Sequence, residues 1–406
     1  MRRSRRTYDV VLYGASGFVG RQTVAYFALH AGGVRWALAG RDLRKLEQAR
    51  AVAGAGATTA GLIVADAHDA AALSALAART KVVLSTAGPF SLYGSALVAA
   101  CVEHGTHYCD ITGETPWVRT LIDAHHERAA ADGTRIVPCC GFDSVPSDIG
   151  ALLVATEVQR VSGQPCTHVK ACHSMRGGVN GGTLASMLHI AGSGGLDALA
   201  DPFLLNPEDS TPDDLEPHAD LLLPTHDADF DGWLAPFMMA PVNTRVVRRS
   251  AALAGPRSPY GDDFVYQEAM RAGRGFKGAA LASGVSAGLG LGAAGLHLSP
   301  VRHALSRLLP APGSGPSERA MDQGSFRCEL VGEAADGTRV RGRVAGQGDP
   351  GNRATTVFVC EAALALAGDA RRLPGGAARG GVLTPATALG LPYARRLAAA
   401  GITVEP

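Results

Sequence analysis

Short apolar runs alternate with longer amphipathic stretches along the first 145 residues. The runs have the length of strands buried on both faces, and the alanine-rich stretches between them carry apolar side chains at helical spacing. The apolar runs lie at 8–12, 35–39, 61–65, 82–85, 107–111 and 135–139. Their alternation with helices predicts an α/β domain built on a parallel sheet, with any ligand outside the carboxyl ends of the strands.

A different pattern begins near residue 146. Further strands are expected at residues 168–175, 326–332 and 338–345, and the last two should form a hairpin across Ala335-Asp336-Gly337. Helices are expected at residues 181–191, 354–367 and 385–400. Thr384 suits the N-cap of the last helix, with Pro385 in its first turn. The expected parts are a first domain at 1–145, a second α+β domain with an antiparallel sheet at 146–347, and a C-terminal segment at 348–406 that packs back on the first domain.

Composition narrows the class of protein. A chain of 406 residues with 46% hydrophobic content can fill two cores, and its net charge of +1 provides no overall field for nucleic acid. The eight cysteines form no Cys-x-x-Cys pair, which predicts reduced thiols, a cytoplasmic protein and no metal site. Four arginines lie within residues 1–6, but the apolar run behind them ends at Gly14, so no export signal is expected.

Charge is unevenly distributed in the second domain. Residues 178–243 contain no Lys or Arg but eleven acidic residues, and we expect an acidic loop at 197–231. A basic segment follows, with Arg245, Arg248, Arg249, Arg257, Arg271, Arg274 and Lys277. Either both segments are solvated surfaces, or the basic segment docks an acidic carrier protein or a phospholipid headgroup.

Residues 278–301 contain no Asp, Glu, Lys or Arg. The segment is long enough to cross a bilayer, but it consists mainly of Gly, Ala and Ser with few leucines, which argues against a span. It suits a helical hairpin or lid that lies on a membrane or covers an acyl chain, or a buried Gly/Ala-rich helix. The sequence leaves these alternatives open, and with them a peripheral place at the plasma membrane.

The first apolar run leads directly into a glycine-rich turn. The turn reads Gly14-Ala15-Ser16-Gly17-Phe18-Val19-Gly20 and opens a helix with apolar residues at helical spacing. Such glycines permit a tight turn, let a pyrophosphate approach the backbone and allow the helix to pack on the sheet. This context predicts a Rossmann-type dinucleotide site.

The second run indicates which dinucleotide. It ends in Gly40-Arg41, where NAD-binding folds place an acidic residue for the ribose hydroxyls. The Arg41 guanidinium suits a 2′-phosphate, so the sequence favours NADP(H), unless Arg41 only begins a solvated helix. Asp66 is expected at the adenine, or as a helix N-cap, and Ala87 and Gly88 along the cofactor toward the nicotinamide.

Several motifs together resemble one family. The motifs lie at residues 14–20, 40–41 (Gly40-Arg41), 85–90, 108–114, 141–148 and 381–391. In combination they resemble the saccharopine dehydrogenase-like oxidoreductases, and within these most closely the trans-acting enoyl reductases of actinobacterial polyketide-lipid synthesis. The resemblance covers nearly the whole chain. It implies an NADPH-binding Rossmann domain, a second α/β domain and a role in glycolipid assembly or at membranes, without fixing the substrate.

Enoyl reduction needs a hydride, a proton and a donor that polarises the carbonyl. Tyr93, beyond the fourth run, and Cys140, Asp143 and Ser144, beyond the sixth, are the candidates for proton delivery. Each also suits a structural role: Tyr93 and Cys140 as packing, Asp143 and Ser144 as helix caps.

Other function classes remain. No tyrosine precedes a lysine by four residues, which excludes the short-chain dehydrogenase mechanism. Cys139 or Cys140 is the well-placed candidate for the nucleophile of a semialdehyde dehydrogenase, but the polar neighbours that such a cysteine needs are absent. A saccharopine dehydrogenase-like imine or amino-acid reductase and a non-catalytic, membrane- or lipid-associated NADP-binding protein stay as alternatives to the enoyl reductase.

Overall fold

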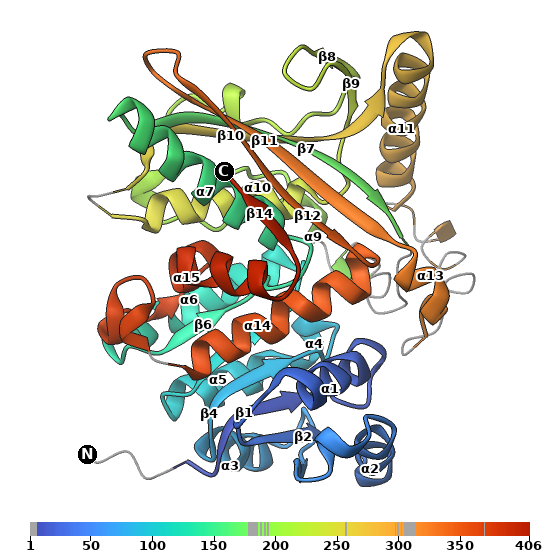
Figure 1. Cartoon of the computed structure of the whole chain (residues 1–406), viewed down its shortest axis with the longest axis vertical. Coiled ribbons are helices and arrows are strands. Elements are labelled where there is room, and N and C mark those ends of the chain that lie inside the picture. The colour runs from blue at the N-terminus through green and yellow to red at the C-terminus, as the bar shows by residue number, and fades with distance from the viewer. Residues whose placement is uncertain are drawn as a thin grey trace.

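A computed structural model describes residues 6–177, 186, 189–190, 192, 195–255, 258–296, 298, 300–301, 303, 314–368 and 370–406. Figure 1 shows one sheet at each end of the molecule, with helices between them. The helix expected at 181–191 falls mainly outside the described residues.

The first sheet is parallel, as predicted. Within the described residues its strands are β1 (Tyr8–Tyr13), β2 (Trp36–Gly40), β3 (Gly61–Val64), β4 (Thr80–Ser85), β5 (His107–Asp110), β6 (Arg135–Val137) and β13 (Gly381–Val382), in the order β13-β6-β5-β4-β1-β2-β3. The helices between them are α1 (Phe18–His30), α2 (Leu43–Val52), α3 (Ala70–Ala78), α4 (Phe90–Tyr93), α5 (Ser95–Glu103) and α6 (Thr115–Ala131). The central strands are buried on both faces, which explains their continuous apolar runs.

The second sheet is mixed rather than antiparallel. Its strands are β7 (Cys166–Arg176), β8 (Thr225–Asp227), β9 (Gly232–Ala235), β10 (Tyr260–Gly273), β11 (Ser325–Ala334), β12 (Arg339–Gln347) and β14 (Thr403–Glu405), in the order β14-β12-β11-β7-β10-β9-β8. The hairpin of β11 and β12 is confirmed, but β10 pairs in parallel with β7. A long crossover connects these two strands, and only such a connection permits parallel pairing.

Helices of the second part lie mainly on the side that faces the first sheet. They are α7 (Val145–Ser162), α9 (Gly195–Ala198), α10 (Ala240–Leu253), α11 (Gly275–Leu296) and α13 (Glu318–Asp322). The α7 helix packs on β11 and β12 and, on its other side, contacts α15 (Pro385–Ala399). The α11 helix is the exception, because it stands at one side of the second sheet (Figure 1).

The C-terminal segment packs back on the first sheet, as expected. β13 pairs with β6, and α14 (Thr355–Ala367) packs on α1, β4 and β5. Thr384 caps α15, since its side chain accepts the Thr387 N–H at 3.2 Å, and Pro385 occupies the first turn. The last residues differ from the expectation: β14 pairs with β12, so the chain ends in the second sheet.

The first three arginines of the basic segment are neither solvated nor free to dock a partner. Arg245, Arg248 and Arg249 lie on α10, and each is 2% exposed. Their guanidinium groups bond to backbone carbonyls: Arg245 to Leu199 and Asp201, Arg248 to Pro202 and His218, and Arg249 to Leu205 and Val382. Arg245 also pairs with Asp220. These three side chains therefore hold the acidic loop against the body.

Removing Arg249 should show this structural role. Arg249→Met leaves the Leu205 and Val382 carbonyls without their donor, so we expect the free energy of unfolding to fall by about 2–4 kcal/mol. Denaturant unfolding measures it. Arg128→Met is the matched control, because the Arg128 side chain is 64% exposed and its pairing with Asp132 is weak. A loss below about 0.5 kcal/mol for Arg249→Met would contradict this role.

Candidate functional site

The glycine-rich turn brings α1 unusually close to the end of β1. Gly14 has φ +80°, and its carbonyl accepts the Gly17 N–H at 2.9 Å. A Cβ atom added at Gly20 would lie 2.1 Å from the Gly14 oxygen, and one at Gly14 would lie 3.0 Å from the Ala87 nitrogen. The backbone can approach this closely only because these positions carry no side chain.

The N-terminus of α1 is suited to a phosphate. Gly17, its N-cap, gives no side-chain hydrogen bond, and the first turn contains no acidic residue. The first N–H groups of this 13-residue helix and its dipole therefore remain available for an anion. This cradle fits a pyrophosphate.

Arg41 and Asp66 lie at the same end of the sheet. Burial and the Asp66 charge together raise the pKa of Tyr13 to about 12, and the Arg41 charge opposes this, so both side chains are near the Tyr13 hydroxyl. Asp66 accepts the His68 N–H at 2.9 Å, whereas the N-cap of α3 is Asp69. The helix-cap alternative for Asp66 is therefore wrong.

The side chain that follows β2 is the guanidinium of Arg41 rather than a carboxylate. Asp42 is the nearest acidic residue along the chain, but its side chain caps α2 by accepting the Lys45 N–H at 3.2 Å. Arg41 is exposed. The residues here fit the 2′-phosphate of NADP(H) better than a bare ribose, because an acidic acceptor for the ribose hydroxyls is missing from this position.

Glu114 organises the segment that follows β4. Its buried carboxylate accepts the N–H groups of Phe90 at 2.8 Å and Ser91 at 2.9 Å, and also the Ser186 hydroxyl at 2.7 Å. It thereby fixes the first turn of α4 next to Ala87 and Gly88. Sequence reasoning missed this role, although a carboxylate directly after β5 is a signal for it.

Tyr93 lies against the loop after β3. Its ring packs edge-to-face on His68, with centroids 5.8 Å apart, and His68 directly follows the Asp66 turn region. This contact draws Tyr93 toward the loop after β3, while the nicotinamide is expected nearer β4, β5 and β6.

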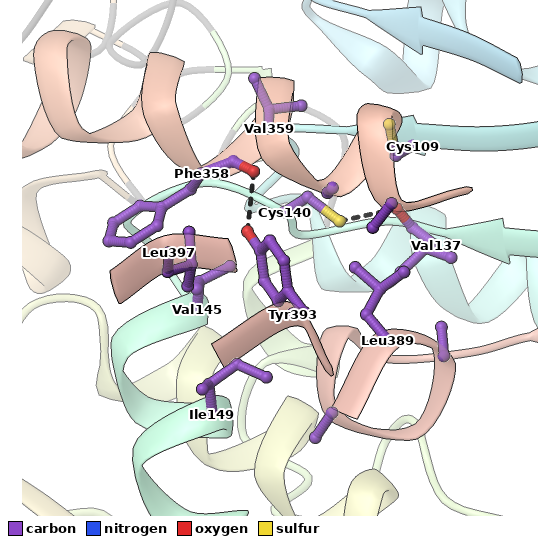
Figure 2. Close-up of a cluster of buried hydrophobic side chains, with 14 of the residues drawn as sticks. Cys109, Val137, Cys140, Val145, Ile149, Phe358, Val359, Leu389, Tyr393 and Leu397 are labelled. Atoms are coloured by element: carbon purple, nitrogen blue, oxygen red, sulfur yellow. Dashed lines mark hydrogen bonds between the residues drawn. The ribbon is translucent and has the colours of Figure 1, made fainter. Parts of the chain in front are cut away.

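Cys140 lies in a hydrophobic cluster between β6, α7, α14 and α15 (Figure 2). Its thiol is 0% exposed and donates to the Val137 carbonyl at 3.3 Å, and burial raises the pKa of the thiol well above its usual value. Tyr393 lies beside it and donates to the Phe358 carbonyl at 2.7 Å. This surrounding favours a packing role for Cys140.

Asp110 sets the shape of the loop that carries Asp143. Cys139 adopts φ +61°, a conformation that costs energy for a residue with a side chain. The Asp110 carboxylate accepts the Cys139 N–H at 3.1 Å and the Thr112 N–H at 3.0 Å, so the loops after β5 and β6 are joined.

Asp143 lies where the two parts of the chain meet. A Cβ atom at Gly113 would be 3.8 Å from the Asp143 Oδ2, and the same point would contact Met239 and Val242 of the α10 region. Burial raises the pKa of Asp143 to about 6. A carboxyl group with this pKa holds a proton near neutral pH more often than an ordinary aspartate and is suited to general acid catalysis.

A buried polar network supports this loop from behind. Ser144 donates to the Asn243 Oδ1 at 3.3 Å, and Asn243 donates to Glu268 at 2.8 Å. Glu268 also accepts from Ser147 and Tyr266 at 2.8 and 2.9 Å. The network joins the start of α7 to the second sheet. Its residues are far apart in sequence, and none of them was predicted except Ser144.

Metal ligands do not gather in the described part of the chain: no group of three or more His, Cys, Asp or Glu side chains there is placed to hold an ion.

Comparison with known proteins identifies the first domain. The saccharopine dehydrogenase NADP binding domain matches residues 10–137. These residues contain the glycine turn, Arg41, Asp66 and Gly88, so this part of the site belongs to an NADP-binding domain. In fold, the whole chain is similar to the L-Glu-forming saccharopine dehydrogenase of Saccharomyces cerevisiae, with a TM-score of 0.53, 14% identity and 98% of each chain covered.

Sequence similarity to mycobacterial proteins extends over the whole chain. One relative from Mycobacterium tuberculosis is 40% identical over 98% of this chain and 97% of its own length. A trans-acting enoyl reductase from Mycobacterium ulcerans is 37% identical over 100% of this chain and 99% of its own length. Another, from Mycobacterium bovis, is 37% identical over 99% of this chain and 98% of its own length. The chain therefore belongs to the saccharopine dehydrogenase-like family that includes the trans-acting enoyl reductases.

Proposed function

We propose that this chain is an NADPH-dependent reductase of the C=C bond in an enoyl thioester or carrier-linked acyl chain, acting in lipid or glycolipid synthesis. The observation that carries the proposal is the similarity of 37% over nearly the full length to proteins named trans-acting enoyl reductases. An acyl carrier or polyketide synthase would be the partner that presents the substrate, and the cytoplasm the place of action.

The residues of the site have separate tasks in this reaction. Bound NADPH supplies the hydride. The N-terminus of α1 holds the pyrophosphate, Arg41 the 2′-phosphate, Asp66 the adenine end, and Ala87 and Gly88 line the path toward the nicotinamide. Asp143 gives its proton to the carbon next to the thioester carbonyl as the enolate charge develops. If so, kcat/KM should fall as the pH rises through about 6, the pKa of Asp143.

Tyr93 and Cys140 remain weaker candidates for the proton. Tyr93 is engaged with His68, and Cys140 is sealed in the core with a thiol that resists ionisation. Asp143 is preferred because its carboxyl group lies at the junction of the two parts and has a raised pKa. Tyr93→Phe and Cys140→Ala are expected to retain most of the activity.

Turnover distinguishes the proposal from its alternatives. The protein is mixed with NADPH and a long-chain enoyl thioester, and the absorbance of the reduced nicotinamide is followed while mass spectrometry identifies the saturated product. Reaction with an imine formed from an amino acid and a keto acid, but not with the enoyl thioester, would favour the imine reductase that the yeast fold suggests. Tight nucleotide binding without turnover of either substrate would favour a non-catalytic module.

Arg41→Ala tests the choice of cofactor. Loss of a charge-assisted contact to the 2′-phosphate should weaken NADPH binding by about 1.5–3 kcal/mol. NADH binding should change little, since NADH lacks that phosphate. Titration of both nucleotides by fluorescence or calorimetry measures the difference, with the exposed Arg128→Ala on α6 as the control. Equal losses for both nucleotides would exclude the proposed contact.

A further inference from the structure

The α11 helix is apolar and yet almost entirely exposed. By length and composition it is long and apolar enough to cross a membrane, and only 6% of its most apolar stretch of 18 residues is buried. Phe276 and Leu291 are 87% and 76% exposed, and Leu281 is 55% exposed. The expectation of a buried Gly/Ala-rich helix at 278–301 is therefore wrong for the described part of this segment.

One face of α11 touches the body along β9 and β10. Gly278 lies against the Gly273 backbone, where an added Cβ atom would be 2.4 Å from the Gly273 oxygen, and Ala282 is 0% exposed. Further along, Gly284, Gly288, Gly290 and Gly292 have open space at their Cα atoms, with no heavy atom within 4 Å of an added Cβ. At these positions the helix meets no other part of the described chain.

The exposed apolar side chains of α11 lie on one broad face. Phe276, Leu281 and Leu291 project within about 140° of one another around the axis. Leu289 is 37% exposed and lies on the side of Gly278 and Ala282, which faces the body. The sequence places no charged residue anywhere from 278 to 301. A broad face without charge suits the apolar interior of a lipid leaflet, while the packed face of the helix stays against the protein.

Cationic residues flank the apolar segment. Arg274 and Lys277 are exposed at its start, where Arg274 pairs with Asp231, and the sequence places Arg302 directly after residue 301. Lysine or arginine beside an apolar helix lies at the level of anionic lipid headgroups and strengthens the binding of that helix. The charge distribution therefore suits a helix that lies in one leaflet with both of its ends near the headgroups.

Both ends of α11 return to the same folded body. β10 ends at Gly273, directly before the helix. On the other side, Gly315 packs on the Phe18 ring of the glycine turn, so close that an added Cβ atom would lie 2.4 Å from the ring. A single crossing of a bilayer would put the two flanking segments on opposite sides. Insertion into one leaflet keeps both on the same side.

We propose that α11 anchors the protein to a lipid bilayer by inserting its apolar length into one leaflet, with Arg274 and Lys277 at the headgroups. This anchor concerns where the protein acts and is independent of which bond it reduces. Its physical basis is the transfer of exposed Phe and Leu side chains out of water, reinforced by attraction to anionic lipid.

Vesicle flotation tests the anchor directly. Full-length protein is mixed with phosphatidylcholine vesicles with or without phosphatidylglycerol, and we expect it to float with both and more with the anionic ones. Leu289→Asp with Leu291→Asp should lower the bound fraction about tenfold or more. Lys277→Glu should lower binding to the anionic vesicles only, in a salt-dependent way. No flotation of the wild type, or unchanged flotation of the double variant, would overturn the proposal.

A matched control and a second readout exclude unfolding as the cause. Leu29→Asp with Val52→Asp changes two aliphatic side chains on the first domain that are 81% and 78% exposed, and should leave flotation unchanged. All eight native cysteines are buried, so Leu291→Cys accepts an environment-sensitive dye at one position. Its emission should shift to shorter wavelength with vesicles. A shift caused instead by protein concentration without lipid would show a second copy as the occupant and contradict the anchor.

Discussion

Replacement of Asp143 by asparagine is expected to lower kcat by about 10²–10⁴-fold and, at the same time, to stabilise the protein. The loss of rate follows because the amide cannot donate the proton that the carboxyl group gives. Affinity for NADPH should remain, because the glycine turn and Arg41 bind the other parts of the cofactor. Steady-state kinetics and nucleotide titration measure the two properties separately.

The gain in stability follows from the sign of the pKa shift. Burial raises the pKa of Asp143 from 3.8 to about 6, so the folded protein binds this proton more tightly than the unfolded chain. Below about pH 4 the Asp143 carboxyl group is protonated in both states and does not destabilise the folded protein. As the pH rises to about 6, the free-energy cost of keeping this group in the folded state grows, and above that pH it stays constant. At about 1.4 kcal/mol per pKa unit, Asp143→Asn should raise the free energy of unfolding by about 2–3 kcal/mol at pH 8 and hardly at pH 3.

Asp148→Asn is the matched control for this reasoning. Burial raises the pKa of Asp148 to about 7, but its carboxylate accepts hydrogen bonds from the Ser250 hydroxyl and the Ala386 N–H. An asparagine NH₂ group would oppose one of these donors, so this variant should be destabilised. If Asp143→Asn retains full activity and also shows no gain in stability, Asp143 is not the proton donor and its pKa is not raised in the folded protein.

Gly20→Ala should abolish nucleotide binding although the change is a single methyl group. The added carbon would lie 2.1 Å from the Gly14 oxygen, and both partners are backbone, so neither can rotate away. The start of α1 must therefore move from the end of β1, and its N–H groups leave the pyrophosphate. We expect NADPH affinity to fall about a hundredfold or more, which corresponds to about 3 kcal/mol.

The control for Gly20→Ala is a glycine with space around it. Gly284→Ala in α11 meets no atom within 4 Å and should keep NADPH affinity, with a small gain in helix stability. Circular dichroism and thermal unfolding of both variants show whether the fold is retained. Wild-type affinity in a folded Gly20→Ala protein would remove the glycine turn from the nucleotide site.

The nucleotide domain was largely predictable because its signals are local. The apolar runs, the glycine turn and Gly40-Arg41 each depend on neighbours within a few residues, and the parallel sheet and the NADP-binding domain follow the expected pattern. The capping role of Thr384 was predictable for the same reason.

The roles of other residues depend on partners far away in sequence. The arginine cluster was interpreted as surface, but Arg249 lies between carbonyls at positions 205 and 382. Cys140 follows a strand of the cofactor sheet, yet α14 and α15 bury it. Charge and position along the chain do not reveal such packing, because segments that are distant in sequence decide which side chains of a loop become buried.

The most direct test of the proposed reaction is the fate of the transferred hydride. The protein is supplied with NADPH carrying deuterium at the transferable C4 position and a long-chain 2-enoyl thioester in ordinary water. The account predicts a saturated thioester with one deuterium at the carbon β to the carbonyl and none at the α carbon, where the proton arrives. Oxidation of NADPH without a saturated product, or a saturated product that carries no deuterium at the β carbon, would contradict it.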